Sequence, residues 1–155
     1  MGSDSDLPVI KKVTDLLTQL QIPFEVHIYS AHRTPELASG FAKTARENNF
    51  GVIIAAAGMA AHLAGAIAAH TTLPVIGIPC KSSCLDGIDA LLSTVMMPPG
   101  IPVATVAIDG GKNAALLAAQ ILSLQEQSLA EKLQDLRAQE AQLIADKNAK
   151  IVERL

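Results

Sequence analysis

The feature that most constrains the fold of this chain is the alternation of short apolar runs with longer segments of helical periodicity. Four apolar runs predict strands, at residues 24–29, 51–57, 74–78 and 103–108. Helical segments lie around them, at 6–20, 34–48, 60–70, 86–95 and from 113 to the C-terminus with a break. Nearly continuous apolar strands are typical of parallel sheets covered on both faces. The pattern therefore predicts an α/β fold, a three-layer doubly wound parallel sheet with an extended C-terminal helix.

The beginning of the chain departs from this alternation, because it opens with a helix and not with a strand. Residues 2–6 have the composition of a turn that follows a strand, yet only Met1 precedes them. Either the sheet lacks a strand or the sequence starts late. A sheet that lacks a strand would expose unpaired edges. We therefore expect the natural protein to carry several residues upstream of Met1.

The apolar composition predicts an oligomer. Half of the residues are hydrophobic and 17% are charged, whereas about a quarter of residues are charged in an average soluble domain. A chain this small and apolar is expected to bury apolar surface against other subunits as well as in its own core. The tail at 129–147 has the spacing of an amphipathic helix, and it could pack on its own domain or on a neighbouring subunit. No repeat or linker divides the chain, so residues 1–155 are expected to form one domain.

Several classes of protein fit the composition poorly. Aromatic residues make up 3% of the chain and the net charge is −3, which argues against a nucleic-acid partner. The spacing of Cys80 and Cys84, without a nearby histidine, indicates free thiols and no zinc site. No segment reaches about 18 unbroken apolar residues, as a membrane span would require. The N-terminus lacks the basic and apolar parts of a signal peptide, so we expect a cytoplasmic protein.

The polar residues that could carry chemistry follow the predicted strands. In an open parallel sheet, ligands bind at the carboxyl ends of the strands. We expect the segments found there to converge on one edge, at residues 2–6, 30–34, 58–62, 80–83 and 109–112.

The first of these segments is a candidate anion site. It opens a helix, whose backbone N–H groups and positive dipole end favour a phosphate. Ser3 and Ser5 add hydroxyl donors, and Asp6 could hold a sugar hydroxyl. The alternative is ordinary helix capping by Ser5 or Asp6.

The second segment places two functional side chains next to each other. Arg33 has a planar fork suited to phosphate, and His32 belongs to the residue type that titrates near neutrality. The alternative for His32 is a loop histidine that caps the next helix. His62 is either a second polar contact or a core histidine, and His27, which alternates with apolar residues, is expected to be structural. These residues indicate an enzyme for a small phosphorylated molecule that uses histidine acid–base chemistry.

Taken together, these motifs resemble the N5-carboxyaminoimidazole ribonucleotide mutase family of purine biosynthesis, class I. The similar segments are GSDSD at 2–6, SAHRTP at 30–35, AGMAAHL at 57–63, MPPGIPV at 97–103 and NAALLAAQI at 113–121. They cover nearly the whole chain in the order of the family. Met59 stands where the family usually has Gly, and Ala64 where Pro is usual.

The resemblance implies a flavodoxin-like domain that assembles as a homo-octamer with sites shared between subunits. It implies an isomerase that interconverts N5-carboxyaminoimidazole ribonucleotide and 4-carboxy-5-aminoimidazole ribonucleotide, without a cofactor or metal. His32 then corresponds to the catalytic residue. The substrate-binding residues implied by the matched motifs are Ser3, Ser5, Asp6, Ser30, Arg33, Gly58, Ala60, His62 and Leu63.

Two other functions stay open at this point. Class II relatives carboxylate aminoimidazole ribonucleotide directly with carbon dioxide, but typically carry Lys in place of Arg33 and a polar run near residues 59–61. The other alternative is a non-catalytic nucleotide-binding module. Such a module would need the same phosphate-binding segment at residues 2–6, but no histidine placed for proton transfer.

Overall fold

The computed structural model describes residues 1–152 as an α/β protein built on a parallel sheet. Its strands are β1 (Ile53–Gly58), β2 (Val75–Cys80) and β3 (Ala104–Thr105), in the order β1-β2-β3. Ile53 pairs with Val75, and Ile76 with Ala104. All six residues of β2 are buried, which explains its uninterrupted apolar sequence.

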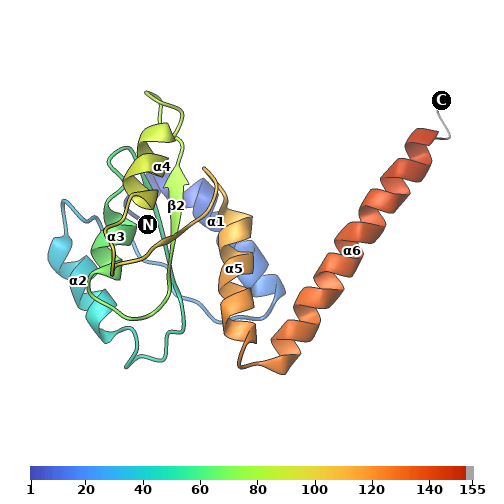
Figure 1. The fold of residues 1–155 in the computed structure, drawn as a ribbon, viewed down its shortest axis with the longest axis horizontal. Helices are drawn as coiled ribbons and strands as arrows, with labels where there is room; N and C mark the ends of the chain where they lie inside the picture. Colours follow the sequence, from blue (N-terminus) through green and yellow to red (C-terminus); the bar gives the residue numbers. More distant parts are fainter. Residues whose placement is uncertain (153–155) are drawn as a thin grey trace.

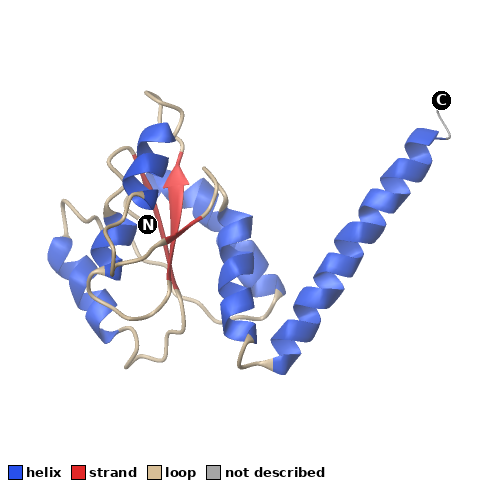
Figure 2. Cartoon of the chain, viewed as in Figure 1, coloured by secondary structure: helices blue, strands red, loops and turns tan. Residues whose placement is uncertain are grey.

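Helices cover both faces of this sheet and make the three layers expected of the fold (Figures 1 and 2). The helices α1 and α5 pack on one face and α2, α3 and α4 on the other, while α6 follows α5 at the end of the chain. Their bounds are α1 (Leu7–Gln19), α2 (Pro35–Thr44), α3 (Leu63–Ala68), α4 (Ile88–Val95), α5 (Gly111–Ser123) and α6 (Gln127–Val152). These confirm the expected helices, with ends that differ by a few residues.

The four predicted strands have different outcomes. The strands expected at 51–57 and 74–78 are confirmed as β1 and β2, and the one at 103–108 is reduced to the two residues of β3. The strand expected at 24–29 is wrong, because this segment has no assigned strand pairing. Among the described residues, its main-chain hydrogen bonds go to Met1. The Met1 amino group donates to the His27 carbonyl at 2.8 Å, and the Met1 carbonyl accepts from the Tyr29 N–H at 2.9 Å.

The long helix α6 packs on its own domain only at its beginning. Leu129 is buried in the core beside α1 and α5, and Leu133 and Leu136 pack against the same cluster. Farther along, Leu143 and Ile144 are exposed, and the helix points away from the rest of the molecule (Figure 1). The beginning of α6 therefore packs on its own domain, and packing of its exposed remainder on a neighbouring subunit stays a prediction. Within residues 1–152, no helix is long and apolar enough to cross a membrane.

Candidate active site

The loops at the carboxyl edge of the sheet meet, as the sequence predicts. The N–H of Gly2 donates to the Ala56 carbonyl of β1 at 3.0 Å, and the Arg33 guanidinium donates to the Gly2 carbonyl at 3.0 Å. On the other side of β2, the N–H of Lys81 donates to the Asp109 carboxylate at 2.9 Å. These contacts join segments that are far apart in sequence into one edge.

The central feature of this edge is a pair of histidines. The Nε2 atom of His32 and the Nδ1 atom of His62 are 2.7 Å apart, and the two rings meet edge to face at 75°. His32 lies in the loop before α2 and His62 directly before α3, and both are exposed. A contact this short needs a proton on one nitrogen and a lone pair on the other. The pair can therefore share one proton between these two nitrogens, at an exposed edge of the sheet.

Arg33 connects the histidine pair to the turn at the N-terminus. Its N–H and Nε both donate to the Ser30 hydroxyl, at 3.2 and 3.4 Å, while its terminal nitrogen reaches Gly2. These bonds fix the guanidinium beside Ser30 and Gly2. The exposed remainder of the guanidinium keeps donors for a phosphate, since the group has five N–H bonds in all.

The turn itself is closed by a capping box. The Ser3 hydroxyl accepts from the Ser5 N–H, and the Asp6 carboxylate accepts from the Ser3 N–H at 3.2 Å. Ser3 is the cap residue of this turn, and Asp6 takes part through its carboxylate. Asp6 also occupies the cap position of α1, where its side chain makes no cap bond. The alternative of capping is therefore confirmed in part for Asp6 and is wrong for Ser5. The exposed Ser5 hydroxyl is available to a ligand.

Asp6 is a buried carboxylate at this exposed edge, and only 7% of its surface is accessible. Burial raises the pKa of Asp6, while the hydrogen bond from the Ser3 backbone acts in the opposite direction. Next to it, burial and then the charge of Asp6 raise the pKa of the Cys80 thiol to about 12. Cys80 is therefore a neutral wall of the site at physiological pH. The sequence places Cys80 in the segment 80–83 at this edge, but it does not show that the thiol lies next to Asp6.

The segment after β1 makes a tight turn that places His62. Met59 adopts a left-handed conformation with φ of 52°, and the N–H groups of Ala61 and His62 bond back to the carbonyls of Met59 and Ala60. Ala60 is exposed beside the histidines, but the Leu63 side chain is buried under α2 and α3. Leu63 can thus offer only its main chain to a ligand.

Two further residues complete the assignment. Gly58 packs against β2, where an added Cβ would lie 3.4 Å from the Cys80 carbonyl. His27 bonds to Glu25 at 2.9 Å and stacks on Tyr29 with ring centroids 5.0 Å apart, which fits the structural role expected of it. Across residues 1–152, no three His, Cys, Asp or Glu side chains gather as a metal site, and both cysteines are free.

Fold and site together define an α/β protein with a capped turn, an arginine and a histidine pair at the carboxyl edge of its sheet. A model of the family described as AIR carboxylase matches residues 1–143. The chain therefore belongs to the AIR carboxylase family.

Similar proteins carry two different names. N5-carboxyaminoimidazole ribonucleotide mutase of Pyrococcus abyssi is 57% identical over 137 residues, which cover 88% of this chain and 79% of that protein. Phosphoribosylaminoimidazole carboxylase of Saccharomyces cerevisiae is 54% identical over 134 residues, which cover 86% of this chain and 24% of that protein. Among solved structures, Treponema denticola PurE superposes with a TM-score of 0.86 and 31% identity, covering 97% of this chain and 94% of that one.

Proposed function

We propose that this chain is an N5-carboxyaminoimidazole ribonucleotide mutase of de novo purine biosynthesis, an isomerase that yields 4-carboxy-5-aminoimidazole ribonucleotide. The observation that carries the proposal is the 2.7 Å contact between His32 and His62, beside the Arg33-bridged turn, in a chain of this family. It unites a proton donor with a phosphate-binding group on one edge of the sheet. This chain also covers 79% of the length of the Pyrococcus abyssi protein that is named a mutase.

The reaction needs one proton delivered and one removed. The substrate is a carbamate, which releases carbon dioxide when its exocyclic nitrogen is protonated. The ring carbon then attacks the trapped carbon dioxide, forms the new carbon–carbon bond, and loses its proton. His32 gives the first proton and takes the second, so it ends in its original state. The contact from His62 orients the imidazole of His32 between the two steps.

The rest of the edge would bind the nucleotide. Arg33 and Ser5 present donors to the phosphate, with Ser3 and Ser30 close by. Asp6 would accept hydrogen bonds from the sugar hydroxyls through its carboxylate. The small residues Ala57, Gly58, Ala60 and Ala61 would form part of the wall that holds carbon dioxide beside the histidines.

A direct assay separates this function from its alternatives. Purified protein is given each carboxylated nucleotide in turn, and the isomer formed is measured by chromatography. Interconversion without added bicarbonate is expected. A protein that binds both nucleotides but interconverts neither would be a binding module, and the proposed function would be wrong.

A second candidate function is direct carboxylation of aminoimidazole ribonucleotide, because one group of relatives is named a carboxylase. Arg33 and the apolar residues at 59–61 favour the mutase, since class II relatives typically carry Lys and polar residues there. Incubation with aminoimidazole ribonucleotide and labelled bicarbonate tests this candidate. Incorporation of label faster than isomerisation would favour the carboxylase.

We also propose that the active form is a homo-oligomer, an octamer by the family resemblance, with each site completed by a neighbour. The histidine pair is exposed on a single chain, whereas trapping carbon dioxide requires a covered site. Apolar side chains also lie exposed on α4 and α6, namely Ile88, Leu92, Val95, Leu143, Ile144 and Ile151. Light scattering at micromolar concentration should give a multiple of the chain mass, and a monomer would contradict this proposal.

A further inference from the structure

Thr34 occupies the cap position of α2, yet its hydroxyl bonds to the loop before the helix. Threonine is a common cap residue because its hydroxyl can accept from an N–H of the first helical turn. The side chain of Thr34 makes no such bond. Its hydroxyl instead accepts from the Ser30 N–H at 2.8 Å and donates to the Ser30 carbonyl at 3.2 Å. The hydroxyl therefore serves the segment that precedes the helix and not the helix itself.

The contacts between Thr34 and Ser30 close the loop that carries His32 and Arg33. The Ser30 carbonyl also accepts from the Thr34 N–H at 2.9 Å, so three bonds join the two ends of the loop. A hydroxyl can make two of them because it donates and accepts at one atom. Ser30 then uses its own hydroxyl to accept from the N–H and the Nε of Arg33. The position of the guanidinium thus depends on Ser30, and that of Ser30 depends on Thr34.

His32 also depends on this closed loop, whereas His62 is held by main-chain bonds of its own turn. Those bonds run from the N–H groups of Ala61 and His62 to the carbonyls of Met59 and Ala60. Among the described residues, the main chain of His32 makes no hydrogen bond. Its place opposite His62, at 2.7 Å, therefore follows from the closure of the loop around it.

From these contacts we infer that Thr34 is a positioning residue of the active site, whose hydroxyl holds the loop that presents His32 and Arg33. This role rests on the proposed mutase function, in which His32 gives and takes the proton. Proton transfer is sensitive to placement, and a displacement of about 1 Å can cost about 100-fold in turnover. Nucleotide binding depends less on the loop, because the guanidinium of Arg33 also donates to the Gly2 carbonyl.

The test removes the Thr34 hydroxyl and then restores it. Thr34→Val keeps the shape of the side chain but loses both hydroxyl bonds to Ser30, Thr34→Ala provides a second variant without the hydroxyl, and Thr34→Ser keeps it. The first two should lower turnover about ten- to 100-fold, while affinity for the carboxylated nucleotide changes less than about threefold. Thr34→Ser should stay within about threefold of the unmodified protein. Full turnover without the hydroxyl, or a Thr34→Ser variant as slow as Thr34→Val, would overturn the inference.

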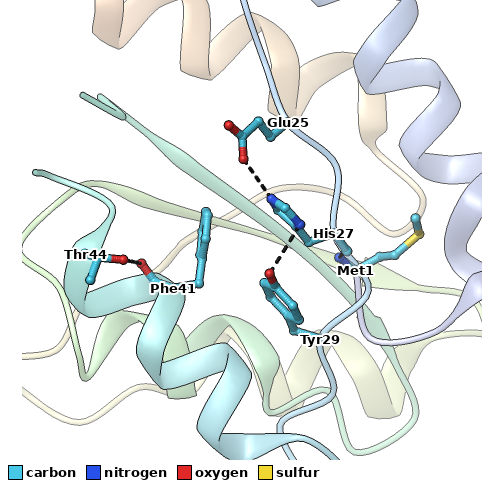
Figure 3. A network of polar contacts seen from close by, with 6 residues as sticks. All are labelled: Met1, Glu25, His27, Tyr29, Phe41 and Thr44. Atoms are coloured by element: carbon cyan, nitrogen blue, oxygen red, sulfur yellow. Dashed lines mark hydrogen bonds and ion pairs between the residues drawn. The ribbon is translucent and has the colours of Figure 1, made fainter. Parts of the chain in front are cut away.

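Thr44, near the other end of α2, offers a matched control. Its hydroxyl donates to the Gly40 and Phe41 carbonyls at 3.1 and 3.4 Å, and Figure 3 shows it beside Phe41. Thr44→Val removes a similar bond at the far end of a helix of ten residues, about 15 Å long. Turnover of this variant should stay within about twofold of the unmodified protein. If Thr44→Val and Thr34→Val lowered turnover equally, the effect would come from the stability of α2 and not from positioning.

A spectroscopic measurement tests the positioning without catalysis. In protein with nitrogen-labelled histidine, the ring nitrogens report whether His32 and His62 remain bonded to each other. Thr34→Val should give His32 signals averaged over both tautomers of a free imidazole, whereas Thr34→Ser and Thr44→Val should keep the bonded signals. This measurement holds even if the unmodified protein does not isomerise the nucleotide, so failure of the proposed function can be told apart from failure of this role. Unchanged histidine signals in Thr34→Val would overturn the inference.

Discussion

Replacing each histidine of the 2.7 Å pair separately should produce losses of very different size. His32→Asn removes the group that gives and takes the proton, and proton transfer by a positioned side chain is worth about 10²–10⁴-fold. His62→Asn removes only the contact that orients His32. A neutral hydrogen bond contributes about 0.5–1.5 kcal/mol. At 1.36 kcal/mol per factor of ten, that is a loss of about two- to 13-fold in turnover.

The assay measures turnover and nucleotide binding separately for both variants. Binding should survive in each, because Arg33 and the 2–6 turn keep their mutual contacts. His70→Asn is the matched control, since His70 lies exposed just beyond α3 and away from the pair. Circular dichroism confirms that each variant is folded.

Two results would refute this reasoning. If His62→Asn abolishes turnover while His32→Asn keeps most of it, the two roles are reversed. If both variants retain full turnover, the proton does not pass through this pair. A loss of nucleotide binding equal to the loss of turnover would place His32 in substrate binding and not in proton transfer.

Three other perturbations have expected outcomes. Arg33→Ala should weaken nucleotide binding by about ten- to 150-fold, the equivalent of about 1.5–3 kcal/mol for bonds to a charged group, and unchanged affinity in calorimetry would contradict the site. Burial raises the pKa of Asp6, so the stability that this group contributes is present below its unfolded pKa near 3.8 and is lost as pH rises through the folded pKa. Asp6→Asn should flatten this part of the curve of unfolding free energy against pH, and an identical curve for the variant would contradict the buried environment of Asp6. A disulfide reagent at pH 8 should label the exposed Cys84 rapidly, but it should label the buried Cys80, whose pKa is about 12, only when the protein unfolds. In the Cys84→Ser variant Cys80 is the remaining thiol, so rapid labelling of that variant would refute the environment assigned to Cys80.

Several parts of this structure were determined by local sequence alone. The strands β1 and β2 are apolar because both of their faces are covered, and that requirement is visible without knowing what covers them. The helices follow from periodicity, and the breaks between them from turn residues. The position of His32, Arg33 and His62 at the carboxyl edge follows from their place directly after apolar runs.

Only the tertiary structure decided which groups touch. The 2.7 Å contact of His32 with His62 crosses 30 positions, and that of Arg33 with Gly2 crosses 31, so loop conformations set both distances. Leu63 lies next to His62 in sequence, yet packing turns its side chain into the core.

The segment 24–29 has the composition of a strand but remains unpaired except at Met1. A strand is defined by hydrogen bonds to a neighbour, and those bonds depend on what lies beside it, whereas a helix bonds within itself and can be read from its own residues.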